Sequence, residues 1–103
     1  MAYGNALQCL SDPTQREVFE RLRLGPKSVG ELARGLPVSR PAVSQHLKVL
    51  KQVGLVNDRA VANQRLYSLD PRGLAGIRAY FDQFWNQALD AFKTAVEQTE
   101  EKP

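Results

Sequence analysis

The chain has 103 residues, enough for one small domain and too few for two of ordinary size. It is 43% hydrophobic, but no apolar run approaches the roughly 20 residues needed to cross a bilayer, and the N-terminus does not resemble a signal peptide. The single cysteine, Cys9, excludes a disulfide framework within the chain and is typical of a reducing compartment. We therefore expect one cytoplasmic domain over residues 1–103, with no membrane partner.

The net charge of +3 is unevenly distributed along the chain. From Lys27 to Arg65 there are seven basic and two acidic residues, whereas from Pro71 onward there are four basic and five acidic ones. A basic segment in a near-neutral protein is typical of a protein that binds an anionic polymer. Surface lysines also serve solubility alone, so composition by itself leaves both interpretations open.

Capping signals divide the first half of the chain into short helices. Asp12 precedes a proline, with Gln15 at the third helical position, and Ser28 stands three residues before Glu31. Each arrangement is typical of a capping box, in which two side chains bond the free amides at a helix start. We expect a helix after each of these caps.

A further helix is expected at about 40–53, capped by Ser39 and joined to the preceding helix by a short connector. Two short helices joined in this way form a helix-turn-helix unit. Within the second helix, Val43, Leu47 and Leu50 share one face at helical spacing and should point into the core.

The opposite face of that helix carries Arg40, Pro41, Ser44, Gln45 and Lys48. A recognition helix places its first turns in the major groove of DNA, where arginine can bond guanine, glutamine can bond adenine, and serine fits several bases. Proline costs nothing in a first turn, whose free amides also favour a phosphate. An ordinary amphipathic helix with a solvated face is the alternative; the capped helix before it and the basic hairpin after it favour DNA binding.

Two strands with a turn around Val61-Ala62-Asn63 are expected at about 55–69, forming a hairpin or wing. Asn63 is the turn residue that best tolerates a left-handed conformation. Arg59 and Arg65 flank the tip and could lie along the DNA backbone or reach a minor groove. Two arginines on a hairpin are common in small domains of any function, and by themselves they do not specify a base sequence.

The last helix is expected at about 71–97, with apolar residues every three or four positions. Its aromatic stripe is wider than one small core needs, so we expect a homodimer through the terminal helices. The residues expected in this interface are Leu7, Leu10, Ile77, Phe81, Phe84, Trp85, Leu89 and Phe92.

A pocket for an apolar effector, lined by Tyr80, Phe84 and Trp85, is the alternative to a dimer interface. A dimer would set two recognition helices about 34 Å apart and read a pseudo-palindromic site.

Other classes of protein fit the residues less well. One histidine, one cysteine and dispersed carboxylates do not form a convergent catalytic site, and no glycine-rich loop could hold phosphates, so we expect neither an enzyme nor a cofactor. A protein-interaction module without specific DNA binding is the remaining alternative. The basic middle of the chain argues against it, and salt dependence of binding would distinguish the two.

The chain resembles the ArsR/SmtB bacterial transcriptional regulators over roughly residues 5 to 98. The resemblance rests on Leu10–Thr14, Val29–Ala33, Ser39–Leu50 and Gly54–Val56, which are specific in combination. It implies a homodimeric winged helix-turn-helix fold, mainly α with a β-hairpin wing, that binds double-stranded DNA. It also implies a repressor that leaves its operator when a ligand binds.

By matching position, the resemblance adds Ser39 and His46 to the DNA contacts, although a histidine at position 46 is as well suited to holding its helix against a neighbour. The full set expected at DNA is Ser39, Arg40, Pro41, Ser44, Gln45, His46, Lys48, Arg59, Asn63 and Arg65.

The chain departs from the metal-sensing members of that family. The cysteines that bind metals there would fall on Ser28 and Gly30, which are not such ligands, and the last helix has no histidine. We therefore expect no metal site, and the effector is unknown. Cys9, among apolar neighbours, is expected in the core.

Overall fold

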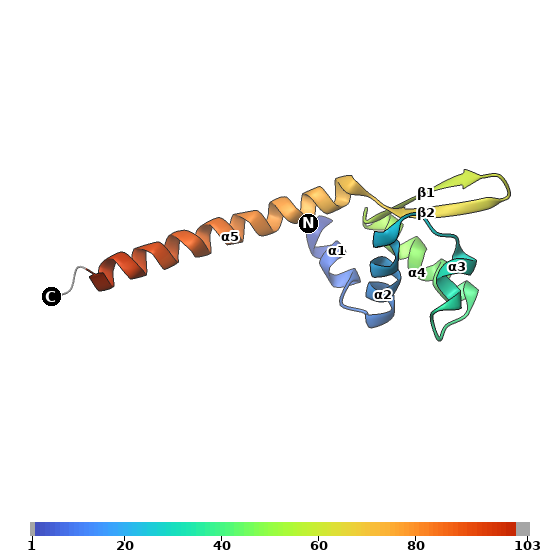
Figure 1. The fold of residues 1–103 in the computed structure, drawn as a ribbon, viewed down its shortest axis with the longest axis horizontal. Coiled ribbons are helices and arrows are strands. Elements are labelled where there is room, and N and C mark those ends of the chain that lie inside the picture. The colour runs from blue at the N-terminus through green and yellow to red at the C-terminus, as the bar shows by residue number, and fades with distance from the viewer. Residues whose placement is uncertain (1, 101–103) are drawn as a thin grey trace.

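The computed structural model of the protein describes residues 2–100, with side chains for residues 4–99. Four short helices cluster together, a hairpin lies at one side of them, and a long helix runs away at the other (Figure 1). In chain order the elements are α1 (Ala2–Cys9), α2 (Pro13–Arg21), the 3₁₀ turn η1 (Leu22–Leu24), α3 (Val29–Arg34), α4 (Arg40–Gln52), β1 (Val56–Val61), β2 (Gln64–Leu69) and α5 (Pro71–Glu100). Within residues 2–100, no helix has both the length and the apolar character needed to cross a membrane.

The helix starts follow the capping signals, with one correction. The capping box at Ser28 is confirmed: Glu31 N–H donates to Ser28 Oγ (3.2 Å), and Ser28 N–H donates to Glu31 Oε1 (3.1 Å). At α2, Asp12 Oδ1 accepts the N–H of Gln15 (3.0 Å), but the expected return bond is absent there. The side-chain amide of Gln15 donates instead to the carbonyl oxygen of Cys9 (2.7 Å), because α1 ends within its reach. This bond ties the end of α1 to the start of α2.

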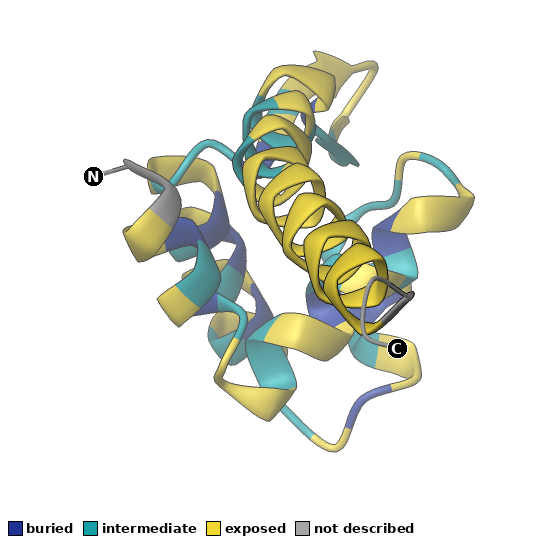
Figure 2. Ribbon diagram, turned by 90° about the vertical axis from the view of Figure 1, so that its left-hand side faces the viewer, coloured by how far each residue is buried: buried dark blue, intermediate teal, exposed yellow. Residues whose placement is uncertain are grey.

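The core lies beneath α4. Val43, Leu47 and Leu50 are completely buried, and they pack with buried side chains of α2, α3 and the segment that enters β1. Cys9 belongs to the same cluster, as its apolar neighbours in the sequence indicated. Figure 2 shows the buried segments gathered in the helical body, whereas α5 is exposed along most of its length. The orientation of α4 about its own axis is therefore set by its buried face.

The hairpin turn is tighter than the sequence suggested. Val61 still belongs to β1 and pairs with Gln64, so only Ala62 and Asn63 form the turn. The left-handed residue is Ala62 (φ 54°), and not Asn63 as expected. Two-residue hairpins need a positive φ at their first central position to match the twist of the strands, and here that position is occupied by alanine.

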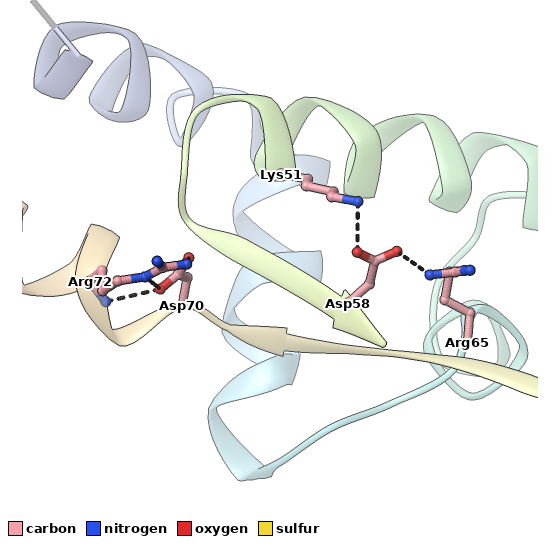
Figure 3. A network of polar contacts seen from close by, with 5 residues as sticks. All are labelled: Lys51, Asp58, Arg65, Asp70 and Arg72. Carbon is pink, nitrogen blue, oxygen red and sulfur yellow. Dashed lines mark hydrogen bonds and ion pairs between the residues drawn. The ribbon is translucent and has the colours of Figure 1, made fainter. Parts of the chain in front are cut away.

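Two sets of contacts hold the wing against the helices. Backbone hydrogen bonds join Lys27 and Tyr67 in both directions (3.0 and 2.9 Å). In addition, Asp58 accepts Lys51 Nζ (2.7 Å) on one carboxylate oxygen and Arg65 Nη1 (3.0 Å) on the other (Figure 3). The Asp58 side chain is only 9% exposed, and the hydrogen bond from Lys51, reinforced by Arg65, holds the pKa of Asp58 below its ordinary value. This Asp58 junction links the last turn of α4 to both strands.

The start of α5 is joined to the end of α4 by backbone contacts. Gly54 (φ +84°) turns the chain after α4, and Asp70 N–H donates to the carbonyl oxygen of Leu55 (2.9 Å). In the first turn of α5, Gly73 lies so close to Gly54 that a Cβ atom at position 73 would collide with the carbonyl oxygen of Gly54. From this joint α5 projects beyond the body, which gives the molecule a longest dimension of 71 Å (Figure 1).

We expect Gly73→Ala to lower the free energy of unfolding by about 1 to 3 kcal/mol, because a methyl group would push two backbone segments apart. Urea unfolding followed by circular dichroism measures the change. Gly4→Ala is the matched control, since a Cβ at position 4 meets nothing within 4 Å. Equal stability of the two variants would contradict the close approach.

We expect Asp58→Asn to lower the free energy of unfolding at neutral pH by about 1 kcal/mol, a modest value because Lys51 and Arg65 are each more than half exposed. A lowered pKa in the folded state means that this stabilisation is complete above the ordinary aspartate pKa of about 3.9 and disappears as the pH falls through the lowered value. The difference between wild type and variant should therefore shrink on acidification. Asp82→Asn, at an exposed position of α5, controls for loss of a negative charge; a gap independent of pH would contradict the assignment.

Candidate nucleic-acid interface

The exposed face of α4 carries half of the residues expected at DNA. Val43 and Leu47 are completely buried on one side of the helix, and this turns Ser44, Gln45 and Lys48 outward. The helix has 13 residues and begins at Arg40, so Ser44 and Gln45 lie in its second turn. Five exposed residues share this face: Arg40, Pro41, Ser44, Gln45 and Lys48. They form a continuous polar surface at the N-terminal end of a helix, as a groove-entering helix requires.

Fewer amides of the first turn are free than the sequence suggested. Ser39 caps the helix: its Oγ accepts the N–H of Ala42 (3.3 Å), and its carbonyl oxygen accepts that of Val43 (3.0 Å). Pro41 has no N–H. In the first turn of α4, this leaves the N–H of Arg40 as the amide that has no hydrogen-bond acceptor among the described residues. The hydroxyl of Ser39 thus already has a structural bond at the helix start.

His46 lies apart from the exposed face. Its side chain is half-buried, on the side of α4 that faces the start of α2. There, the backbone amide of Gln15 is the main group that lowers the pKa of Asp12, and the nearby His46 lowers it further. This placement fits the alternative considered for His46, contact with a neighbouring helix.

The two wing arginines lie on opposite faces of the hairpin. Arg59 pairs with Leu66 and Arg65 pairs with Ala60, so their strand positions differ by one residue, and successive side chains alternate between faces. Arg65 lies on the Asp58 side and is ion-paired there, whereas Arg59 has no ion-pair partner within residues 2–100. Asn63 is exposed at the turn. The sequence placed both arginines at the tip but could not separate their faces.

Asp58 is a residue whose role sequence reasoning missed. It was counted only as one of two acids in a basic segment, yet it engages two of the seven basic side chains there. The signal lay in the length of the turn: with a two-residue turn, positions 58 and 65 become diagonal neighbours on one face.

The residues expected in a dimer interface fall into two groups. Leu10 and Ile77 pack against the core of the domain itself, and Leu7 is half-buried. Farther along α5 the apolar side chains are exposed, with Trp85 at 67% and Phe92 at 66%. We call this exposed set the α5 stripe; it comprises Phe81, Phe84, Trp85, Leu89, Phe92 and Val96.

Tyr80 borders the α5 stripe. Its ring packs edge-on against those of Phe81 (centroids 5.8 Å apart) and Phe84 (5.0 Å). The aromatic side chains of this part of the helix therefore contact one another.

A metal site needs several ligand side chains close together. Within the described part of the chain, no three His, Cys, Asp or Glu side chains are grouped as metal ligands would be. Cys9 is buried in the core, and burial raises the pKa of its thiol.

Comparisons with known proteins agree with this geometry. A family profile described as "Helix-turn-helix domain" matches residues 10–59. The HTH-type transcriptional regulator Rv2034 of Mycobacterium tuberculosis is 55% identical over 92 residues, covering 89% of this chain and 86% of that protein.

Two solved structures are also similar. A possible transcriptional regulator for arsenical resistance is 43% identical, with a TM-score of 0.71 over 88% of this chain and 95% of its own. An ArsR-like transcriptional regulator from Rhodococcus sp. RHA1 is 27% identical, with a TM-score of 0.79 over 99% of this chain and 95% of its own. With its helix-turn-helix, two-stranded wing and long last helix, the chain belongs to the ArsR/SmtB family of winged helix-turn-helix transcriptional regulators.

Proposed function

We propose that the protein is a repressor that binds a pseudo-palindromic operator as a homodimer. The observation that carries this proposal is the exposed polar face of α4, which is fixed in orientation by three completely buried residues on its other side. A helix held in this way presents the same few side chains to every duplex, and this is the requirement for reading sequence.

We assign base contacts to Ser44 and Gln45 of that face, and phosphate contacts to Lys48 of the same face and to Arg59 of the wing. The amide of Gln45 can donate to and accept from adenine, whereas the exposed amine of Lys48 acts as a point charge toward the backbone. Ser39, Pro41 and Asn63 lie at the edges of the surface, where contact with the sugar-phosphate backbone is expected. The unpaired Arg59 is the better wing contact, because Arg65 would have to leave Asp58 to reach a phosphate.

The α5 stripe supports the homodimer. It continues the same side of α5 on which Ile77 packs against the body, but no part of residues 2–100 covers it. An exposed row of aromatic and aliphatic side chains of this length is typical of an interface between subunits. A second copy, related by a two-fold axis, would bury the row and place its own α4 to read the second half-site.

Selection of duplexes from a random pool tests the operator. Wild type at moderate salt should enrich a pseudo-palindrome with half-sites about 10 base pairs apart. Gln45→Ala should lose the preference at one position in each half-site, with discrimination there reduced by about 1 to 3 kcal/mol. An unchanged enriched sequence would contradict the base contact of Gln45, and no enrichment by wild type would contradict sequence-specific binding.

Trp85→Asp tests the dimer, because a carboxylate in the α5 stripe would be buried without a partner. The variant should have the mass of one 11.5 kDa chain by light scattering, and its affinity for the operator should fall. Gln83→Asp, at an exposed position on the other side of α5, should remain dimeric. If both variants kept the mass of two chains, the α5 stripe would not be the interface.

A further inference from the structure

A groove adjoins the N-terminal end of α4. It lies between the first turn of α3, the first turn of α4 and the start of β2, and has a volume of about 540 Å³. Its charged lining comprises Glu31, Arg34, Arg40 and Arg65. Arg40 belongs both to this lining and to the exposed face of α4, so the groove adjoins the surface proposed to bind DNA.

The lining of the groove has a net positive charge, because it carries three arginines and one glutamate. Glu31 is its only carboxylate among the described residues, and that carboxylate accepts the N–H of Ser28 in the capping box, which is the main cause of its lowered pKa. Arg65 is ion-paired with Asp58. Within residues 2–100, neither Arg34 nor Arg40 forms an ion pair, although the charge of Arg34 is among the smaller causes of the lowered pKa of Glu31.

The position of Arg40 depends on a glycine. The guanidinium of Arg40 lies directly over Gly30: a Cβ atom at position 30 would stand 3.2 Å from Nη2 and 3.4 Å from Cζ. The separation from Nη2 is tighter than an ordinary van der Waals contact and that from Cζ is at its limit, so with a methyl group at position 30 the guanidinium would have to shift by a few tenths of an ångström. The side chain of Arg40 therefore reaches back to α3, and its guanidinium lines the groove.

We propose that the groove binds a phosphate of the DNA backbone through the guanidinium of Arg40, and that Gly30 is the residue that positions this guanidinium. The inference rests on the proposed DNA binding and changes the role of Arg40, which the sequence had suggested for guanine. A guanidinium offers several N–H donors to phosphate oxygens, and the charge of Arg34 adds to the attraction. Sequence reading then belongs to the second turn of α4.

The test is a double-mutant cycle with Gly30→Ala, Arg40→Ala and the double variant. Binding to the selected operator and to a duplex with one altered half-site is measured by fluorescence anisotropy over a range of salt concentrations. Arg40→Ala should weaken binding to both duplexes by the same factor and reduce the slope of log affinity against log salt by about one. Gly30→Ala should weaken both by a smaller common factor, about threefold to tenfold, and the double variant should bind no worse than Arg40→Ala, because two residues that act through one contact do not add.

The stability of the Gly30→Ala variant shows whether weaker binding comes from a misplaced Arg40 or from damage to the fold. Gly30→Ala should unfold at the same urea concentration as wild type or a higher one, because alanine favours a helix and the atoms it displaces belong to the end of a flexible side chain. Gly4→Ala, also in a helix but with nothing within 4 Å of its new methyl group, should bind both duplexes as wild type does.

Three outcomes would overturn the inference. Loss of discrimination between the two duplexes in Arg40→Ala, with an unchanged salt slope, would make Arg40 a base contact. Additive effects of the two substitutions would mean that Gly30 does not act through Arg40. A wild-type protein whose binding ignores both sequence and salt would overturn the proposed function itself and this assignment with it, whereas the first two outcomes leave the proposed function intact.

Discussion

The burial of one face of α4 is the constraint on which the rest of the molecule depends. Val43, Leu47 and Leu50 are completely inside the core, and a rotation of the helix would bring them into water at a cost of about 2 kcal/mol for each aliphatic side chain exposed. The polar face is therefore held by hydrophobic burial on the far side of the helix, without bonds of its own. The side chains proposed to meet DNA are therefore not needed to fix the orientation of the helix that carries them.

A single carboxylate, that of Asp58, divides the cations in the basic middle of the chain into two groups, those that are ion-paired with it and those that are not. Asp58 engages Lys51 and Arg65, so these two cations contribute to the cohesion of α4 with the wing, whereas Lys48 and Arg59 have no ion-pair partner among the described residues. A count of basic residues treats all of them alike. The structure separates cations that hold the wing in place from cations that are available to an anionic partner, and the division follows from the face of the strand on which each one lies.

The sequence predicted those features whose causes are local. Caps at Ser28 and Ser39, the apolar spacing of α4 and the exposed apolar row of α5 each depend on residues within a few turns of one another. What it could not predict depends on contacts between distant segments. The side chain of Gln15 bonds to α1 because α1 ends beside it. The two wing arginines lie on opposite faces of the hairpin because the turn contains only Ala62 and Asn63.

The candidate site was predictable to a similar extent. Ser44, Gln45 and Lys48 were placed on one exposed face by helical spacing alone, and they lie there in the structure. His46 follows Gln45 directly, yet one residue is a rotation of about 100° around a helix, and this turns it toward α2. The position of Arg40 over Gly30 joins two helices, so no pattern within either helix contained it.

The contact between Gly54 and Gly73 has a mechanical consequence. Two backbones meet there with no side chain between them, and the neighbouring hydrogen bond from Asp70 to Leu55 is also between backbone atoms. Side chains at a joint between two helices can change rotamers, and so absorb a movement of one helix. Main-chain atoms in direct contact cannot do this, so a movement of one helix is transmitted to the other. In a two-fold pair of chains, the angle at which α5 leaves this joint sets the separation of the two α4 helices. In the proposed dimer, the spacing of the half-sites would thus be determined at a contact between two glycines, far from the side chains proposed to touch a base.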